Sequence, residues 1–258
     1  MSGGGGGSLM SDIFLTEINE KLKLYQKRGG LTFGTDAYLL SAYMKKRHTS
    51  VAVELGSGTG VISLLCASRG DFAKIYALEL QPEFAALCEK NIKENALDGR
   101  VVSLCRDIRQ FAMGDITETV ETVFANPPYM RADSGRANEK SEKQIARHEV
   151  HGSIYDFAAC AARVLKHGGY FYTVYRPDRL IELIAALREN KLEPKRMTFV
   201  HARSGLAPCL VLVESKLGAA ASLSVTPPLI MYKQMSEYTS ELNYIYENGE
   251  FNEQYQKA

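Results

Sequence analysis

The chain has 258 residues and a formal net charge of +1 at pH 7, with 45% hydrophobic and 24% charged residues. This composition is typical of a globular protein and argues against a disordered or fibrous chain. No apolar run reaches the roughly 18 residues that a membrane-spanning helix needs, so we expect no membrane contact. The near-neutral charge gives no general attraction to nucleic acid, so any such contact must come from a local patch.

The first ten residues, MSGGGGGSLM, are interpreted as a flexible leader or tag and are left out of the fold. The five cysteines are scattered, odd in number and lack a CxxC pair. We therefore expect free, buried thiols in a reducing compartment, the cytoplasm, with neither disulfides nor a zinc site. His148 and His151, with Glu149 between them, lack further ligands, so we expect no metal.

From residue 50 onward, apolar strand-like runs alternate with helical patterns. We predict strands at 51–55, 75–80, 101–105, 122–125, 170–175, 197–201 and 209–215, and helices at 61–68, 82–96, 153–166 and 177–190. This alternation predicts an α/β fold, a mostly parallel sheet with helices on both faces. The last two strands are joined by a short loop, so they should form an antiparallel hairpin. The result is a seven-stranded, Rossmann-like sheet.

The flanking segments are less regular. Residues 12–47 are predicted to form an irregular or short-hairpin opening, followed within that range by a helix at 35–46. The tail after Pro227 and Pro228 is rich in tyrosine. We expect it to be peripheral, packed in part, and frayed from Gly249 onward.

A glycine-rich loop, ELGSGTG at 54–60, follows the first predicted strand. Glycines there allow a tight turn and let backbone N–H groups approach a ligand closely. Glu79 ends the next strand, where a carboxylate can accept hydrogen bonds from both hydroxyls of a ribose. The residue after Gly60 is Val61, so the GxGxxG/A dinucleotide fingerprint fails. An ordinary strand-end acid is the alternative for Glu79 alone, but together with the loop a nucleoside site is favoured.

The loop, GxGxG preceded by Glu54, resembles motif I of S-adenosylmethionine-dependent methyltransferases. The resemblance implies that backbone N–H groups of the three glycines suit the cofactor carboxylate and that Glu54 suits its ammonium group. Asp107, just after the third predicted strand, is then placed to accept a hydrogen bond from the adenine amino group. The expected cofactor contacts are therefore Glu54, Gly56, Gly58, Gly60, Glu79, Leu80, Asp107, Ile108 and Asn126.

A second motif, Asn126-Pro127-Pro128-Tyr129, follows the strand predicted at 122–125. It falls at the carboxyl edge of the sheet, where ligands bind in open α/β folds. Asn and Pro also occur in ordinary turns, so the motif alone leaves a rigid turn open. Beside the glycine loop, however, it resembles the catalytic motif of amino-methyltransferases. Those enzymes methylate planar nitrogens: adenine N6, cytosine N4 or glutamine N5.

The chemistry explains these residue types. A planar amine is a poor nucleophile because its lone pair is delocalised, and two acceptors aimed at its hydrogens can localise that pair. The Asn126 side-chain oxygen and the Pro127 carbonyl are the expected acceptors, and Pro127 and Pro128 fix the loop geometry. Tyr129 can stack on the substrate and hold it in line with the methyl group. No strong base is needed, because the methylated nitrogen loses its proton easily.

The opening GGLTFGTDAYLL at 29–40 resembles the FGTDAxLL segment of small-domain methyltransferases that act on RNA. QIARHEVH (144–151), RPDR (176–179), EPKRMTFV (193–200) and PPLIMY (227–232) are similar to the valine-tRNA adenine-N6 methyltransferase family. The resemblance implies methyl transfer to adenine N6 in tRNA. It also implies that Phe33, Gly34 and Thr35 close over the methionine end of the cofactor, although Phe33 can equally be a core residue.

Two other functions stay open. A glutamine-N5 methyltransferase of release factors usually carries an extra helical domain before the sheet, and only about forty residues precede it here. A non-catalytic RNA-binding module on the same fold is the third hypothesis. RNA contacts could come from the basic segment 45–48 and from a basic loop with Arg131, Arg136, Lys140, Lys143 and Arg147. Acidic neighbours dilute this charge, so a solvated loop is as good an interpretation.

We divide the chain into a leader (1–10), an N-terminal segment packing on the cofactor site (11–48), a methyltransferase domain (49–218) and a C-terminal extension (219–258). The oligomeric state does not follow from the sequence, which is compatible with a monomer.

Overall fold

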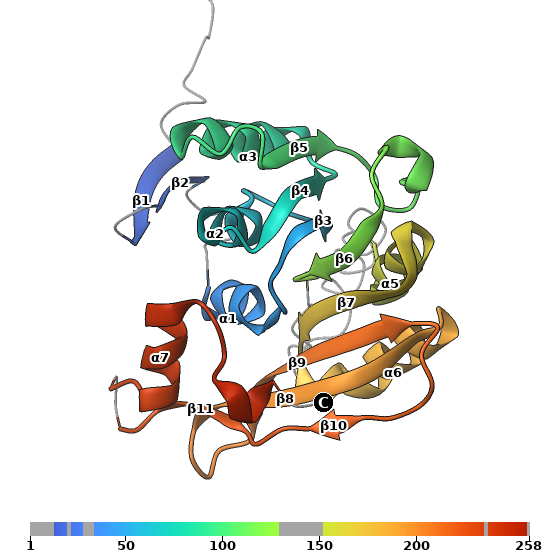
Figure 1. The fold of residues 1–258 in the computed structure, drawn as a ribbon. Coiled ribbons are helices and arrows are strands. Elements are labelled where there is room, and N and C mark those ends of the chain that lie inside the picture. Colours follow the sequence, from blue (N-terminus) through green and yellow to red (C-terminus); the bar gives the residue numbers. More distant parts are fainter. Residues whose placement is uncertain (1–12, 20–21, 28–33, 129–151, 235–236, 257–258) are drawn as a thin grey trace, which may run out of the picture.

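The structure, a computed structural model, describes residues 13–19, 22–27, 34–128, 152–234 and 237–256 (Figure 1). A nine-stranded sheet forms its centre. The strands are β3 (Arg47–Leu55), β4 (Phe72–Glu79), β5 (Val101–Cys105), β6 (Val120–Ala125), β7 (Leu165–Tyr175), β8 (Leu192–Arg203), β9 (Pro208–Leu217), β10 (Ser224–Val225) and β11 (Leu229–Tyr232). Their order is β10-β8-β9-β7-β6-β3-β4-β5, and β11 also pairs with β8.

The predicted fold class is confirmed. Strands β5, β4, β3, β6 and β7 are parallel neighbours, and β9 runs antiparallel between β7 and β8. All seven predicted strands are present, and β8 is longer than expected because residues 192–196 extend it. The short strands β10 and β11 were not predicted. They add to β8 in the parallel direction.

Helices cover both faces of the sheet (Figure 1). Helices α1 (Thr35–Tyr43), α2 (Val61–Arg69) and α3 (Pro82–Glu94) pack on one face, and α5 (Ile154–Val164) and α6 (Leu180–Glu189) pack on the other. Successive strand residues point to opposite faces. Ala52 therefore joins the core under α1 and α2, whereas Val53 joins the core under α5. Because both faces are covered, the central strands are mostly apolar where they are buried.

The pairing of β3 with β6 fixes the position of both sequence motifs. The chain leaves β3 toward β4 and β5 on one side of the sheet and returns to β6 and β7 on the other. Such a reversal in strand order is where open α/β sheets bind ligands. Leu55, which precedes the glycine loop, lies opposite Ala125, which precedes Asn126. The two motifs are therefore neighbours at one edge.

The N-terminal segment forms a hairpin of β1 (Ile13–Asn19) and β2 (Leu22–Lys27), as the hairpin alternative predicted. It packs on α3 through two asparagines one turn apart. Asn91 accepts from the backbone N–H of Tyr25 at 2.7 Å, and Asn95 accepts from that of Lys23 at 2.9 Å. Asn91 also donates to the carbonyl of Thr59 at 2.9 Å, which links the hairpin to the glycine loop.

The C-terminal tail is better ordered than the sequence suggested. Helix α7 (Ser240–Asn248) and a 3-10 turn (Glu253–Tyr255) follow β11. The expected fraying from Gly249 onward is wrong for the described residues, since Phe251 and Tyr255 are 1% and 2% exposed. The ring of Phe251 makes edge contacts with Tyr43 and Tyr255 at 5.3 Å between centroids. Burial of these aromatic rings against α1 therefore orders the tail, although its composition is polar.

The cysteines are all free, but two of them are not buried as expected. Cys105 and Cys209 are exposed, the first at the last position of β5 and the second near the start of β9. Across the described residues, no helix combines the length and the hydropathy needed to cross a membrane.

Removing the Phe251 ring tests whether the tail belongs to the core. Phe251→Ala should lower the free energy of unfolding by about 3–5 kcal/mol, because the substitution leaves a cavity between α1 and the tail. Urea unfolding followed by circular dichroism measures the change. Ile181→Ala is the matched control: Ile181 is 84% exposed, so its loss should stay within about 0.5 kcal/mol. Equal effects of the two substitutions would contradict the packing role.

Candidate active site

The glycine loop has the backbone that the sequence pattern requires. Gly56, Gly58 and Gly60 have φ values of 69°, 55° and 85°, in the left-handed region that favours glycine. A Cβ at Gly60 would lie 2.4 Å from the sulfur of Cys88, so this glycine also lets α2 approach α3. At Gly58, by contrast, a Cβ would meet nothing within 4 Å. The loop therefore packs tightly at its end and leaves open space at its centre.

Glu79 lies against this open part of the loop. One carboxylate oxygen accepts from the backbone N–H of Gly58 at 2.8 Å, and the other accepts from that of Gln81 at 2.9 Å. The side chain is only 6% exposed. The side-chain amide of Gln81 also donates to the second oxygen, at 3.5 Å. A carboxylate offers about four acceptor positions, so about one is left for a hydroxyl donor while all three hydrogen bonds persist. Leu80 follows, half-buried. This arrangement suits the predicted ribose contact.

Glu54 is buried beneath the loop, with 2% exposure. It accepts hydrogen bonds from the backbone N–H and the hydroxyl of Ser63, in the first turn of α2. Burial raises the pKa of Glu54 from 4.5 to about 8, the Ser63 hydrogen bonds oppose this rise, and the nearby Glu79 adds to it. A ligand carrying an ammonium group would favour the charged form.

Asp107 has a competing partner that the sequence did not reveal. The Arg109 guanidinium donates to both of its carboxylate oxygens at 2.6–3.0 Å. These hydrogen bonds lower the pKa of Asp107. Arg163 of α5 fixes the same loop by donating to the carbonyls of Ile108 and Phe111, each at 2.7 Å. The hydrogen bond from the adenine amino group to Asp107 stays a prediction. It requires the Asp107 carboxylate to accept from the adenine and from Arg109 at the same time.

The second motif begins directly beside the glycine loop. Asn126 is half-buried, Pro127 is buried and Pro128 is exposed. The loop therefore presents its polar atoms at the edge of the sheet where the glycine loop, Glu79 and Asp107 also lie. Tyr129 and Phe33 lie outside the described residues, so their predicted roles are unchanged.

One residue of this site was missed in the sequence. Asp36, in the first turn of α1, accepts a 3.0 Å hydrogen bond from the Nδ2 of Asn126. Gly34 and Thr35 precede it, both half-buried, and place the start of α1 beside the second motif. The FGTDA pattern contained the signal, because an acid inside a motif is a candidate partner for a motif amide.

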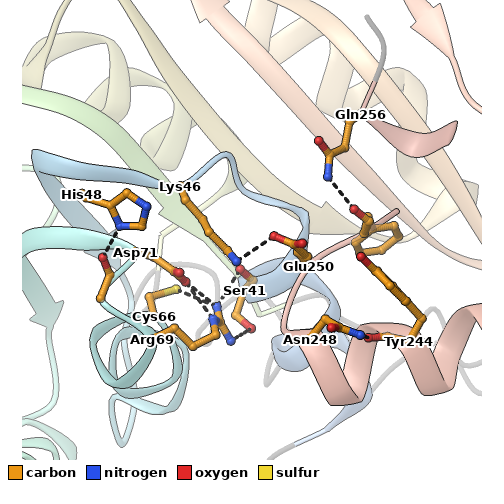
Figure 2. Close-up of polar contacts among 12 residues, drawn as sticks. Ser41, Lys46, His48, Cys66, Arg69, Asp71, Tyr244, Asn248, Glu250 and Gln256 are labelled. Carbon is orange, nitrogen blue, oxygen red and sulfur yellow. Dashed lines mark hydrogen bonds and ion pairs between the residues drawn. The ribbon is translucent and has the colours of Figure 1, made fainter. Parts of the chain in front are cut away.

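The basic segment 45–48 lies at the other end of the sheet. Arg47 begins β3, whereas the glycine loop follows its last residue. Lys45, Lys46 and Arg47 each form an ion pair with a glutamate of another segment. Figure 2 shows Lys46 beside Glu250 of the C-terminal extension. These three basic side chains are therefore paired within the protein, and they lie at the opposite end of the sheet from the second motif.

Two further predictions fall outside the described residues. One concerns the histidine pair weighed as a metal site, and the other concerns the basic loop that includes Arg131, Arg136, Lys140, Lys143 and Arg147. Within the described part of the chain, no cluster of three His, Cys, Asp or Glu side chains could hold a metal ion.

Comparison with known proteins identifies the family. The family described as "Methyltransferase small domain" matches residues 28–188, more than half of the chain. The chain belongs to this family, so the resemblance of its motifs is confirmed. The matched range begins before α1 and ends in α6, and it therefore contains every residue of the candidate site.

Named relatives and solved structures agree with this assignment. A relative from Phocaeicola vulgatus, named tRNA1(Val) (adenine(37)-N6)-methyltransferase, is 28% identical over 198 residues, which cover 76% of this chain and 82% of the relative. One of the same name from Bacteroides fragilis is 25% identical over 194 residues, covering 75% and 81%. A predicted O-methyltransferase of Agrobacterium tumefaciens superposes with a TM-score of 0.68 at 23% identity, covering 84% of this chain and 98% of its own.

The protein is thus an S-adenosylmethionine-dependent methyltransferase of the small-domain family. The TYW2 protein of M. jannaschii, solved in complex with AdoMet, has the same fold, with a TM-score of 0.53 at 14% identity over 80% of this chain and 85% of its own. The residues at the sheet edge fit this cofactor. No other atom lies within 4 Å of a Cβ built at Gly58, Glu79 accepts from the N–H of Gly58, and Glu54 accepts from Ser63 directly after the loop.

The raised pKa of Glu54 predicts how stability depends on pH. Between 4.5 and about 8 the folded state holds a proton on Glu54 that the unfolded state has lost. Stability should therefore fall as pH rises through this window, by at most about 1.4 kcal/mol per pH unit. Glu54→Gln should flatten this dependence. Urea unfolding at pH 5, 6, 7 and 8 measures it, and identical pH profiles for the two proteins would refute the assignment.

Loss of the Glu79 carboxylate should weaken cofactor binding. Glu79→Gln keeps the size of the side chain but removes the charge that accepts hydroxyl donors, so the affinity should fall by about 1–3 kcal/mol. Isothermal calorimetry with S-adenosylmethionine measures the difference. Glu118→Gln is the control, since this half-buried carboxylate pairs with Lys74 and precedes β6, at the end of the strand opposite to Asn126. Unchanged affinity in Glu79→Gln would remove the ribose assignment.

Proposed function

We propose that this methyltransferase transfers a methyl group to the exocyclic N6 amine of an adenine in tRNA, in one direct in-line step. The observation that carries the proposal is the adjacency of two loops. Asn126 and Pro127 follow β6, the glycine loop follows β3, and these strands are paired up to their last residues. A planar amine held by the first loop would thus lie beside a cofactor held by the second.

In the proposed reaction the second loop makes the amine reactive. The bound cofactor supplies a methyl group on a positively charged sulfur. The Oδ1 of Asn126 and the carbonyl of Pro127 accept hydrogen bonds from the two amine hydrogens, which localises the nitrogen lone pair toward the methyl group. Pro127 and Pro128 have no N–H groups, so the loop offers acceptors without competing donors. In the same proposal, Tyr129 stacks on the base.

The proposal also assigns cofactor roles to residues of this chain. Gly56, Gly58 and Gly60 let backbone N–H groups approach the carboxylate, and Glu54 binds the ammonium group in its charged form. Glu79 accepts from the ribose hydroxyls. Leu80 and Ile108 line the adenine, Asp107 accepts from its amino group, and Phe33, Gly34 and Thr35 close over the methionine end.

The choice of an adenine in tRNA is supported by the names of the relatives. The relatives from Phocaeicola vulgatus and Bacteroides fragilis are both named tRNA1(Val) (adenine(37)-N6)-methyltransferase and are 28% and 25% identical to this chain. The protein aTrm5, solved in complex with tRNALeu, shares the fold, with a TM-score of 0.51 at 19% identity over 80% of this chain and 53% of its own. Residues 36 and 126–128 supply a site for a planar amine. A cytoplasmic location suits the five free cysteines.

Mass spectrometry of nucleosides tests the proposal. Total tRNA from cells that lack the protein is incubated with the purified enzyme and labelled S-adenosylmethionine, then digested. We expect labelled N6-methyladenosine to accumulate. Transfer to a release-factor protein and not to RNA would favour the glutamine-N5 hypothesis, and transfer to neither would favour a binding module.

Asn126→Ala tests the acceptor mechanism in the same assay. Loss of one acceptor aimed at the amine should reduce the transfer rate by roughly 100- to 1,000-fold. Cofactor affinity should stay within about threefold, because Gly58 and Glu79 are untouched. Turnover at the wild-type rate would show that the amide takes no part in the reaction.

A further inference from the structure

The Asn126 amide is held by a carboxylate from a distant part of the chain. Its Nδ2 donates to Oδ2 of Asp36, 90 residues earlier, at 3.0 Å. The other oxygen of Asp36 accepts from the backbone N–H of Ala37 at 2.9 Å, which keeps the carboxylate against the first turn of α1. Both side chains belong to half-buried residues. A hydrogen bond in such a place is stronger than one in open water.

The direction of this bond decides which end of the amide is left for a substrate. The two ends of a primary amide are nearly the same in shape, and rotation exchanges donor and acceptor. A carboxylate accepts hydrogen bonds, so the NH2 group must face Asp36 and Oδ1 must face away from it. Donation to an anion also draws electron density toward the amide oxygen, which strengthens Oδ1 as an acceptor.

We infer that Asp36 is a positioning residue for the methyl transfer: its carboxylate orients the Asn126 amide so that Oδ1 is presented to the substrate amine. This inference rests on the proposed function. In the opposite orientation, the hydrogens of Nδ2 would face the hydrogens of the amine. The lone pair would then stay delocalised and the reaction would be slow. Asp36 acts through Asn126 and needs no contact with the substrate.

Gly34 gives separate evidence for the position of the Asp36 carboxylate. A Cβ at Gly34 would lie 2.5 Å from Oδ1 of Asp36. The φ of Gly34 is −118°, which any residue adopts, so its backbone conformation does not require a glycine. The glycine is therefore needed for space, and the Asp36 carboxylate fills that space. The opening of α1 is shaped around this carboxylate.

Helix α1 carries Asp36 at its start and is fixed at its other end. The last carbonyls of a helix have no partner within it. Arg69 donates to the carbonyl of Ser41 at 3.0 Å, as Figure 2 shows, and Arg196 donates to the carbonyl of Tyr43 at 2.7 Å. Two guanidinium groups thus occupy the free end of α1. A helix held in this way presents its first turn in one position.

Single variants at Asp36 test the inference. In Asp36→Ala, kcat for tRNA methylation should fall on the order of 10- to 100-fold. The KM for tRNA and the Kd for S-adenosylmethionine should each stay within about threefold, because the binding residues are untouched. Thermal unfolding checks that the variant is folded. A wild-type kcat in Asp36→Ala would overturn the inference.

An exchange of the two groups separates orientation from a structural role of Asp36. Asn126→Asp alone places two carboxylates against each other, and their repulsion should lower kcat. Adding Asp36→Asn restores a donor facing an acceptor and leaves one carboxylate oxygen for the substrate. The double variant should exceed Asn126→Asp alone about tenfold or more. No gain from the second substitution would overturn the inference, because a structural role in α1 predicts none.

The wild-type protein in the same assay distinguishes the two levels of proposal. Wild-type protein that methylates no RNA refutes the proposed function. If the wild-type protein is active and either Asp36→Ala or Asn126→Asp is fully active as well, the role of Asp36 is refuted and the proposed function is not.

Discussion

The parallel pairing of β3 with β6 is the constraint on which the site depends. Leu55 and Ala125 lie opposite each other at the ends of these strands, so the loops that follow them begin side by side. The pairing is strongly specified because both faces are buried. Val53 and Val123 point into one core, and Ala52 and Phe124 into the other. A slip of one residue would send every side chain of a strand to the wrong core.

Four carboxylates meet at this edge: Asp36, Glu54, Glu79 and Asp107. Each is held by a donor, namely the Asn126 amide, Ser63, backbone N–H groups and Arg109. The nearby Glu79 raises the pKa of Glu54, so the charges of these two acids interact. S-adenosylmethionine carries a sulfonium and an ammonium group. A concentration of acids, two of them almost fully buried, suits such a cation.

The C-terminal extension is part of the same unit and not an appendage. Arg196 is fully buried on β8 and forms an ion pair with Glu214 at 2.8 Å. It also donates to the carbonyls of Tyr43 in α1 and Tyr255 in the tail. The side chain of Arg196 therefore connects β8, the end of α1 and the tail. The start of α1 in turn carries Asp36, which accepts from the Asn126 amide.

The sequence by itself determined the parallel sheet, its final hairpin and the position of both motifs. These features follow from local patterns: apolar runs, glycines with left-handed backbone and prolines after a strand. The tertiary structure alone decided the bond from Asn126 to Asp36, the burial of Phe251 and the addition of β10 and β11 to β8. Each of these joins side chains or strands through space or shared packing. Periodicity and turn chemistry describe a segment by itself and carry no information about which distant segment will pack against it.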